Sequence, residues 1–323
     1  MTPAIIGAGA WGTALGLVAS DAGAQDVLLW SHDPAQAHEI ATLRENRRRL
    51  PGVKLPANLT ATANAAQLSA CDTLFFCVPA QSLRGVLTQL GPHLKPGAAA
   101  LICAKGIEQA TGKLMPQVLA EAGLGLRPFL LSGPSFASDV AARKPAAVTL
   151  AGPTLQHAQS LAERLSTPAF RIYASADLTG VAIGGAAKNV LAIACGIAEG
   201  LDLGDSARAA LTTRAFAELL RLGRALGAAP ETLGGLSGLG DLLLTCSSPQ
   251  SRNFSLGLAL GREEQPTGKL AEGAFTAGIL VRLAQDHGLD LPICEAVARV
   301  LDGSSRPVDE VPRLLTRPIK AEF

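Results

Sequence analysis

The sequence predicts an α/β protein with a doubly wound, mostly parallel sheet in its N-terminal part and an all-α part after it. Over the first 180 residues, short apolar runs alternate with helical patterns. Several of these runs are continuously apolar, as in parallel strands that are covered on both faces. Beyond about residue 180 the strand-like runs stop and helical patterns follow one another. Such an order is typical of a two-domain protein whose sheet domain comes first.

The elements are expected in the following order. The apolar runs predict strands at residues 4–7, 26–30, 73–78, 99–104, 127–132, 146–151 and 170–173. Helical spacing of apolar residues predicts helices at 11–22, 34–46, 81–91, 111–122, 154–166, 180–200, 205–227, 249–261, 275–288 and 292–302. We place the boundary near Ser175–Gly180, which divides the chain into residues 1–178 and 179–323.

Composition excludes several classes of protein. Of the 323 residues, 48% are hydrophobic and 17% are charged. The chain therefore has enough apolar residues to form large cores, and a mainly disordered protein is excluded. The first 180 residues carry 14 basic and 11 acidic side chains, and the remainder carry 14 and 16. Neither part has the basic excess of a nucleic-acid binder.

The spacing of cysteines and histidines argues against a metal or disulfide framework. No CxxC, HxxxH or HExxH occurs, so we expect no metal site and reduced, buried thiols in a cytoplasmic protein. The apolar stretch 180–198 is long enough to span a bilayer, but Lys188 and Asn189 lie at its centre. A lysine there costs roughly 2.5–3.5 kcal/mol, so we expect no membrane insertion.

A glycine-rich turn follows the first predicted strand. Gly7, Gly9 and Gly12 form a GxGxxG pattern that leaves this strand and opens a helix. The first glycine permits a tight turn, the second lets the backbone approach a pyrophosphate, and the third allows close helix–strand packing. The N–H groups at the helix N-terminus then hold the phosphates. The pattern predicts a Rossmann domain that binds a dinucleotide.

The residues after the second strand bear on which dinucleotide binds. Ser31 at the strand end leaves room for a 2′-phosphate, which a carboxylate there would repel. His32 and an arginine from the run Arg47–Arg49 can bind that phosphate. Asp33 keeps the alternative of an unphosphorylated ribose open. We expect NADPH to be preferred, with NAD not excluded.

Two further strand ends carry polar residues. Lys105 follows the run 99–104, and the polar loop Ser132–Ala137 follows the run 127–132. Alone, each is better explained as a surface lysine or a turn. Because ligands bind beyond the carboxyl ends of parallel strands, their common location favours a site.

Lys188 is the only Asp, Glu, Lys, Arg or His residue between Gly180 and Ala198. Desolvation among apolar neighbours would lower its pKa toward neutrality, which suits a general acid or base. The alternative is a lysine with a packed stem and a solvated head. Asp241, in a glycine-rich apolar setting, can orient Lys188 or anchor a hydroxyl, or it can simply cap the next helix.

A candidate phosphate receptor lies further along the chain. Ser248 and Pro249 have the pattern of a helix N-cap and first residue, which would place Ser251, Arg252 and Asn253 in the first turn. A hydroxyl, a guanidinium and an amide at a helix N-terminus can bind a phosphate. The alternative is ordinary capping with a surface arginine.

Taken together, seven ordered segments resemble the bacterial NAD(P)-dependent glycerol-3-phosphate dehydrogenase family: GAGAWGTAL, CAKGIE, SGPSFA, GGAAKNV, GLGDLLLTC, QSRN and LAEG. The resemblance implies interconversion of dihydroxyacetone phosphate and sn-glycerol 3-phosphate, for glycerophospholipid synthesis in the cytoplasm. It also implies a Rossmann domain, an all-helical domain and a homodimer.

The resemblance assigns roles to individual residues. Lys188 matches the proton donor and acceptor. The positions that bind substrate match Lys105, Gly133, Ser135, Lys188, Asp241, Ser251, Arg252 and Asn253. Together with the glycine-rich turn and the arginine run, the cofactor-binding set is Gly7, Gly9, Ala10, Trp11, Gly12, His32, Arg49, Lys105, Ala137, Arg252, Leu270 and Glu272. Ala10 departs from the serine common in the family, which removes a hydroxyl contact and leaves the backbone N–H.

Other functions stay open at this point. One is a related two-domain dehydrogenase acting on another hydroxy acid or sugar phosphate, and another is a non-catalytic NADP-sensing protein. Lys188 and the triplet Ser251–Asn253 argue against a sensor, which needs no hydride-acceptor site. Gly133–Ala137 nearly forms a GxSxG elbow, but no histidine follows in a convincing triad position, so a hydrolase is disfavoured.

Overall fold

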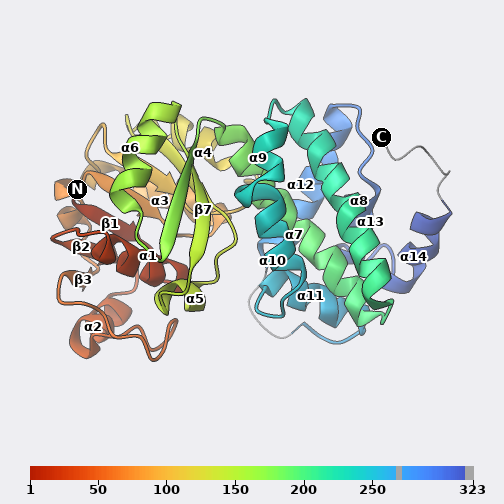
Figure 1. Ribbon diagram of the computed structural model, residues 1–323, viewed down its shortest axis with the longest axis horizontal. Coiled ribbons are helices and arrows are strands. Elements are labelled where there is room, and N and C mark those ends of the chain that lie inside the picture. Colours follow the sequence, from red (N-terminus) through yellow and green to blue (C-terminus); the bar gives the residue numbers. More distant parts are fainter. Residues whose placement is uncertain (267–270, 317–323) are drawn as a thin grey trace.

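The computed structural model describes residues 1–266 and 271–316, and its sheet and its helical part lie side by side (Figure 1). The eight strands have the order β3-β2-β1-β4-β5-β6-β7-β8. All neighbouring strands are parallel except β6 and β7, which confirms the predicted doubly wound, mostly parallel sheet. The strands are β1 (Pro3–Ile6), β2 (Val27–Trp30), β3 (Leu59–Thr62), β4 (Thr73–Phe76), β5 (Ala99–Ile102), β6 (Arg127–Ser132), β7 (Ala146–Ala151) and β8 (Phe170–Ser175).

Helices cover both faces of this sheet. Alternate side chains of one strand point to opposite faces, so Ile5 and Phe75 enter the core beneath α1 and α6, whereas Ile6 and Phe76 enter the core beneath α3 and α4. Burial on both faces explains why these strands read as continuous apolar runs. The helices of this part are α1 (Ala10–Asp21), α2 (Pro34–Leu43), α3 (Leu83–Leu90), α4 (Met115–Glu121), α5 (Ala137–Ala141) and α6 (Leu155–Leu165).

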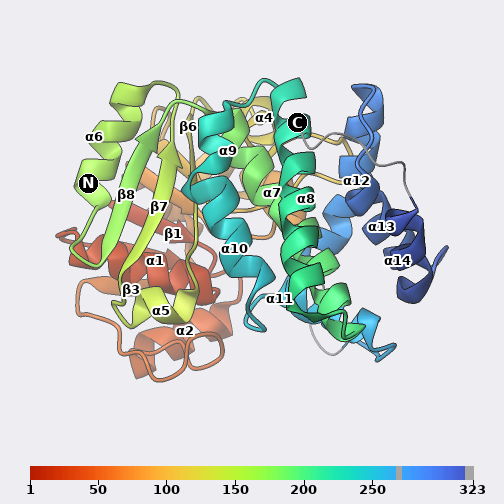
Figure 2. The same cartoon turned by 45° about the vertical axis from the view of Figure 1, so that its right-hand side comes forward.

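The second part is helical in its described residues (Figure 2). Its helices are α7 (Leu178–Gly200), α8 (Gly204–Ala225), α9 (Pro230–Gly234), α10 (Asp241–Cys246), α11 (Arg252–Gly261), α12 (Glu272–Asp286), α13 (Pro292–Leu301) and α14 (Pro307–Leu315). Because β8 ends at Ser175 and α7 begins at Leu178, we retain the division at residue 178 as a proposal.

Several elements differ from the sequence-based prediction. β3 was not predicted, since Leu59–Thr62 contains two threonines and pairs only with β2 at the sheet edge. The short helices α5 and α9, and the terminal α14, were also not predicted. The helix expected from residue 249 begins at Arg252 because the Ser251 hydroxyl, not that of Ser248, accepts the capping bond from the Phe254 N–H at 3.2 Å. The Ser248–Pro249 cap was therefore wrong.

α7 forms the core of the helical part. It is the one helix in the described chain long and apolar enough to cross a membrane, but 94% of its apolar window is buried within the protein. Its first turns, with Val181, pack against the sheet, and its later turns, with Ile193, belong to the helical core. This helix therefore joins the two parts.

Backbone-to-backbone packing joins α7 to α11. A Cβ on Gly196 would lie 2.1 Å from the Phe254 carbonyl oxygen, and one on Gly257 would lie 2.1 Å from that of Ile193. Real Cβ atoms do not come this close, so neither position accepts a side chain without a shift of one helix. The N-terminus of α11, with Arg252, is thereby fixed relative to α7.

Gly257→Ala should lower the free energy of unfolding by about 1–3 kcal/mol, because the added methyl group overpacks the helix crossing. Gly278→Ala is the matched control. Gly278 also lies inside a helix, α12, but a Cβ there would meet no atom within 4 Å in the part of the chain that the structure describes. That control should raise stability by up to about 1 kcal/mol through helix propensity. Denaturant unfolding measures both, and equal effects of the two substitutions would contradict the packing account.

Candidate active site

The glycine-rich turn between β1 and α1 has the geometry of a phosphate cradle. Gly7 has φ +113°, and a Cβ there would lie 2.6 Å from the Cys77 carbonyl oxygen. A Cβ on Gly12 would lie 2.0 Å from the Gly7 carbonyl oxygen, whereas a Cβ on Gly9 would meet no atom of residues 1–266 or 271–316 within 4 Å. The first N–H groups of α1, from Ala10 and Trp11, have no acceptor within the helix, and the N-cap Gly9 has no side chain to cap them. The residues fit a dinucleotide pyrophosphate.

The residues expected at the adenosine ribose lie at the end of β2. Ser31 is buried and donates from Oγ to Gln36 Oε1 at 2.9 Å, so no carboxylate occupies the strand end. Asp33 caps α2 by accepting from the Ala35 N–H, and it also pairs with Arg48 at 3.3 Å. The side chains of His32 and Arg49 are exposed.

Lys105 and Lys188 converge on one buried carboxylate. Lys105, just after β5, donates from Nζ to Asp241 Oδ2 at 2.6 Å, and Lys188, on α7, donates to Oδ1 at 2.7 Å. Asp241 is the first residue of α10 and is 2% exposed. This contact is the one expected if Asp241 orients Lys188, and Asp241 does not cap α10, because the N-cap is Gly240.

The loop after β6 closes one side of this cluster. Lys105 Nζ also donates to the Gly133 carbonyl oxygen at 3.3 Å, and Ser135 Oγ donates to the same oxygen at 3.0 Å. Gly133 has φ +155°, and a Cβ there would lie 2.7 Å from the Val148 Cα. Only glycine fits this position, which brings the carbonyl to the lysine.

Burial and neighbouring charges set the protonation of the cluster. Desolvation lowers the pKa of Lys188 to about 8, with the Asp241 charge opposing that shift and the Lys105 charge adding to it. Burial by itself would raise the pKa of Asp241, but Lys105 and Lys188 hold that pKa below its ordinary value. Asp241 is therefore ionised, and Lys188 can gain or lose a proton near neutral pH.

Thr245 and Asn189 complete the cluster and were not identified from the sequence. Lys188 Nζ donates to Thr245 Oγ1 at 2.7 Å, and that hydroxyl donates in turn to the Asp241 carbonyl oxygen at 2.5 Å. Asn189 Nδ2 donates to the Lys105 carbonyl oxygen at 3.1 Å. Two hydrogens of the Lys188 ammonium are thus used, and the third has no partner within the described parts of the chain.

The predicted phosphate receptor adjoins the cluster through Asn189. Asn253 Nδ2 donates to Asn189 Oδ1 at 2.8 Å, and Asn253 Oδ1 accepts from the Gly273 N–H at 2.9 Å. The side chain of Arg252, at the start of α11, is exposed. The amide of Asn253 therefore links α7, α11 and α12, and Arg252 is left with its guanidinium toward solvent.

Glu272 carries an acceptor that is buried without a partner. Its Oε1 accepts from the Ala80 N–H at 3.2 Å, whereas its Oε2 is buried and unpaired among residues 1–266 and 271–316. Burial raises the pKa of Glu272, and the Ala80 N–H and Arg252 offset this only in part. An unpaired buried acceptor fits an N–H donor of a bound cofactor. Of the other predicted cofactor residues, Ala137 begins α5, and Leu270 lies outside the described residues.

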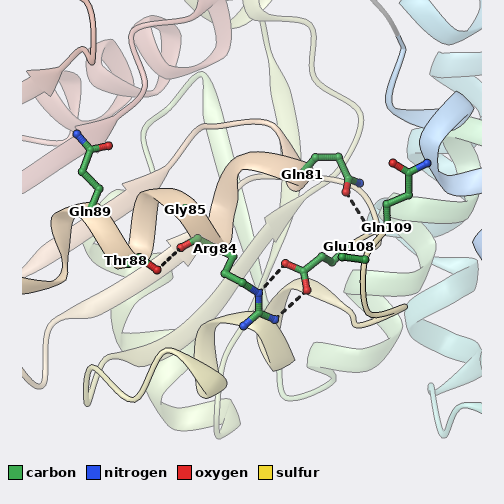
Figure 3. A pocket seen from close by; sticks show the side chains of 8 residues that line it. Gln81, Arg84, Gly85, Thr88, Gln89, Glu108 and Gln109 are labelled. Atoms are coloured by element: carbon green, nitrogen blue, oxygen red, sulfur yellow. Dashed lines mark hydrogen bonds and ion pairs between the residues drawn. The ribbon is translucent and has the colours of Figure 1, made fainter.

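A surface hollow of about 870 Å³ beside α3 is not the site of these groups (Figure 3). In it, Arg84 donates to both oxygens of the buried Glu108 at 2.8 Å, which holds the pKa of Glu108 below its ordinary value. Gln81 donates to the Ile107 carbonyl oxygen at 2.8 Å. These contacts anchor the loop that follows Lys105. No cluster of metal ligands occurs in the described part of the chain.

Comparisons with known proteins agree with this geometry. Residues 3–158 match the model described as NAD-dependent glycerol-3-phosphate dehydrogenase N-terminus, and residues 177–312 match its C-terminus counterpart. The chain is 55% identical to glycerol-3-phosphate dehydrogenase [NAD(P)+] of Bradyrhizobium diazoefficiens, over 99% of this chain and 98% of that one. The protein of the same name from Parvibaculum lavamentivorans is 50% identical over 99% and 97%. The crystal structure of glycerol-3-phosphate dehydrogenase from Coxiella burnetii aligns with a TM-score of 0.92 and 39% identity, covering 98% and 99% of the two chains.

The Lys188–Asp241 contact predicts how the pKa of Lys188 responds to substitution. The acetylation rate of Lys188, followed by mass spectrometry, should rise with pH as a group of pKa about 8 loses its proton. In Asp241→Asn the midpoint should move to lower pH, because the carboxylate that favours the ammonium is gone while Lys105 remains. A midpoint that stays in place or rises would show that Asp241 does not control Lys188.

Proposed function

The chain belongs to the NAD-dependent glycerol-3-phosphate dehydrogenase family and is a glycerol-3-phosphate dehydrogenase that uses NAD or NADP; from this premise we propose which residues carry out the reaction. Its substrate is accordingly a phosphorylated small molecule. The observation that carries the proposal is the buried Lys188, held 2.7 Å from Asp241 with one ammonium hydrogen unpaired among the described residues.

We propose that Lys188 is the general acid and base. In the reducing direction the protonated lysine donates its free hydrogen to the C2 carbonyl oxygen of dihydroxyacetone phosphate. A reduced nicotinamide, when bound, supplies the hydride that C2 accepts, so the carbonyl becomes the secondary alcohol of sn-glycerol 3-phosphate. Lys188 is left neutral, and in the reverse direction it accepts the hydroxyl proton. A pKa of about 8 allows both forms near neutral pH.

Asp241 and Lys105 support that proton transfer. Asp241 fixes the direction of the Lys188 ammonium, and Thr245 fixes it from a second side. Two lysines against one carboxylate leave a net positive charge in a buried site. This charge stabilises the negative charge that develops on the carbonyl oxygen, which is the usual basis of oxyanion stabilisation.

Arg252 is our candidate for binding the substrate phosphate. Arg252 is exposed at the N-terminus of α11, and its charge partly offsets the rise that burial causes in the pKa of Glu272. The Ser251 hydroxyl accepts from the Phe254 N–H and keeps its own hydrogen to donate, and Asn253 keeps a second amide hydrogen. Such charge-assisted bonds far from C2 position the reacting carbon.

We also propose that NADPH is preferred to NADH. Asp33, which would repel a 2′-phosphate, is already engaged as the cap of α2 and as a partner of Arg48. Exposed His32 and Arg49 are the candidate ligands for this phosphate. The ratio of the rates with the two coenzymes tests this preference.

The cellular setting remains a proposal that rests on the resemblance. We propose a cytoplasmic homodimer whose product feeds glycerophospholipid synthesis. Half-buried apolar side chains at the edge of the helical core, among them Leu256 and Leu260 on α11, are available for a dimer contact. Sedimentation of the purified protein measures the oligomeric state.

Purified protein should oxidise NADPH, and NADH more slowly, when dihydroxyacetone phosphate is added. Lys188→Ala should lower this turnover by roughly 10²–10⁴-fold, because proton transfer by a positioned side chain is lost. Loss of nicotinamide absorbance measures the rate, and a binding titration should show that the variant still holds NADPH. Near-normal turnover in Lys188→Ala would contradict the assignment.

Arg252→Ala should raise the KM for dihydroxyacetone phosphate roughly tenfold or more, since a charge-assisted bond of about 1.5–3 kcal/mol is removed. Arg262→Ala is the matched control, because Arg262 is an exposed arginine at the opposite end of α11. An unchanged KM in Arg252→Ala, or an equal rise in both variants, would place the phosphate elsewhere.

A further inference from the structure

Two buried side-chain amides hold one carbonyl group of the glycine-rich turn. Gln36 Nε2 donates to the Ala8 carbonyl oxygen at 2.9 Å, and Asn46 Nδ2 donates to the same oxygen at 3.1 Å. Gln36 is 8% exposed and Asn46 is 1% exposed. Gln36 comes from α2, and Asn46 follows α2 in the loop that leads to the arginine run. Neither residue belongs to the catalytic cluster.

The surrounding hydrogen bonds fix which end of each amide faces the turn. Thr13 Oγ1 donates to the Gly9 carbonyl oxygen at 2.8 Å, so toward Asn46 it can only accept, and Asn46 Nδ2 donates to it at 2.8 Å. Ser31 Oγ donates to Gln36 Oε1, which leaves Gln36 Nε2 for the Ala8 carbonyl. Asn46 Oδ1 is buried and has no partner in the described chain, so Asn46 is oriented by its donor side alone.

Holding this carbonyl determines where the next N–H points. The Ala8–Gly9 peptide is trans, and in a trans peptide the C=O and the N–H point in opposite directions. With the Ala8 oxygen turned inward to the two amides, the Gly9 N–H is directed to the other side of the turn. The space beside Gly9 is open, since a Cβ there would meet no atom of the described residues within 4 Å. A carbonyl turned outward would instead present a negative dipole to an anion.

We propose that Asn46 and Gln36 are positioning residues for the cofactor pyrophosphate: they hold the Ala8 carbonyl inward and thereby aim the Gly9 N–H at the phosphates. The inference rests on the proposed function only in taking a nicotinamide dinucleotide as the ligand of this turn. Because the pyrophosphate is common to NADPH and NADH, the two residues affect both coenzymes equally.

Asn46 also connects this turn to the arginine run through its backbone. The Asn46 carbonyl oxygen accepts from the Arg49 N–H at 3.1 Å and from the Leu50 N–H at 2.8 Å. One residue therefore anchors the segment carrying Arg49 by its main chain and the pyrophosphate turn by its side chain. A side-chain substitution that keeps the backbone separates these two effects.

The test is the Kd of NADPH and of NADH for Asn46→Asp, measured by calorimetry without substrate. The substitution keeps the shape of the side chain but replaces the Nδ2 donor by an oxygen that repels the Ala8 carbonyl. Asn58→Asp is the matched control. Like Asn46, Asn58 donates from Nδ2 to a backbone carbonyl oxygen, that of Ala24, at 2.8 Å. Ala24 lies just beyond the C-terminal end of α1, whereas the glycine-rich turn lies at its N-terminal end.

Asn46→Asp should raise the Kd of both coenzymes by the same factor, roughly tenfold or more. Asn58→Asp should leave both values unchanged, whatever it does to the melting temperature. If Asn46→Asp is too unstable to titrate, Gln36→Glu removes the other donor to the same carbonyl and carries the same expectation.

Two results would overturn the proposal. One is a lowered melting temperature with unchanged Kd values, which would make the amides merely structural. The other is weakened binding of NADPH alone, which would place their effect at the 2′-phosphate. The outcome does not depend on the substrate: binding of both coenzymes without reduction of dihydroxyacetone phosphate would contradict the proposed reaction and leave this inference standing.

Discussion

The arrangement of the site depends on one buried carboxylate that two lysines share. Asp241 accepts from Lys105 through one oxygen and from Lys188 through the other. A buried charge is costly unless it is paired and hydrogen-bonded. Here the carboxylate gives both ammonium groups a negative partner, and each ammonium group donates a hydrogen bond to one carboxylate oxygen. Since Lys105 follows a strand of the sheet and Lys188 lies on α7, the same carboxylate joins the two parts of the chain. The charge left over suits an anionic substrate and a developing oxyanion.

Small residues on α7 make this convergence possible. A Cβ on Gly185 would lie 3.2 Å from Ser132 Oγ and 3.4 Å from Lys105 Cγ, and one on Gly184 would lie 3.1 Å from the Ser237 carbonyl oxygen. Larger side chains would separate α7 from β6 and from the segment that leads into Asp241. Because glycines also bring α11 against the far end of α7, the lysine and the Arg252 region are set by backbone contacts. Such contacts do not repack as flexible side chains can, which keeps the distance between proton donor and phosphate receptor fixed.

Strands buried on both faces were predictable because their apolar runs are continuous. Lys188 was predictable as a site residue because a single charge in an apolar helix is costly to bury without a partner. β3 was not predictable, since a short edge strand with two threonines lacks a continuous apolar run.

Thr245 was missed although it lies four residues after Asp241 and so on the same helix face, a spacing that could have identified it. Asn189, a buried amide beside Lys188, needed a partner, but which one depends on long-range packing. The prediction of Ser248 as the N-cap was wrong because Ser248 and Ser251 both suit the start of this helix, and the local sequence pattern does not distinguish them.

The most direct test of the account is the pH dependence of kcat/KM for reduction of dihydroxyacetone phosphate, which reports the pKa of the acid before this substrate binds. Lys188 must be protonated to act as the acid, and its pKa in the protein is lowered to about 8. The rate should therefore be constant at lower pH and fall as pH rises through about 8, while glycerol 3-phosphate oxidation rises over the same range. A reduction rate that stays constant or increases through that range would show that Lys188 is not the proton donor.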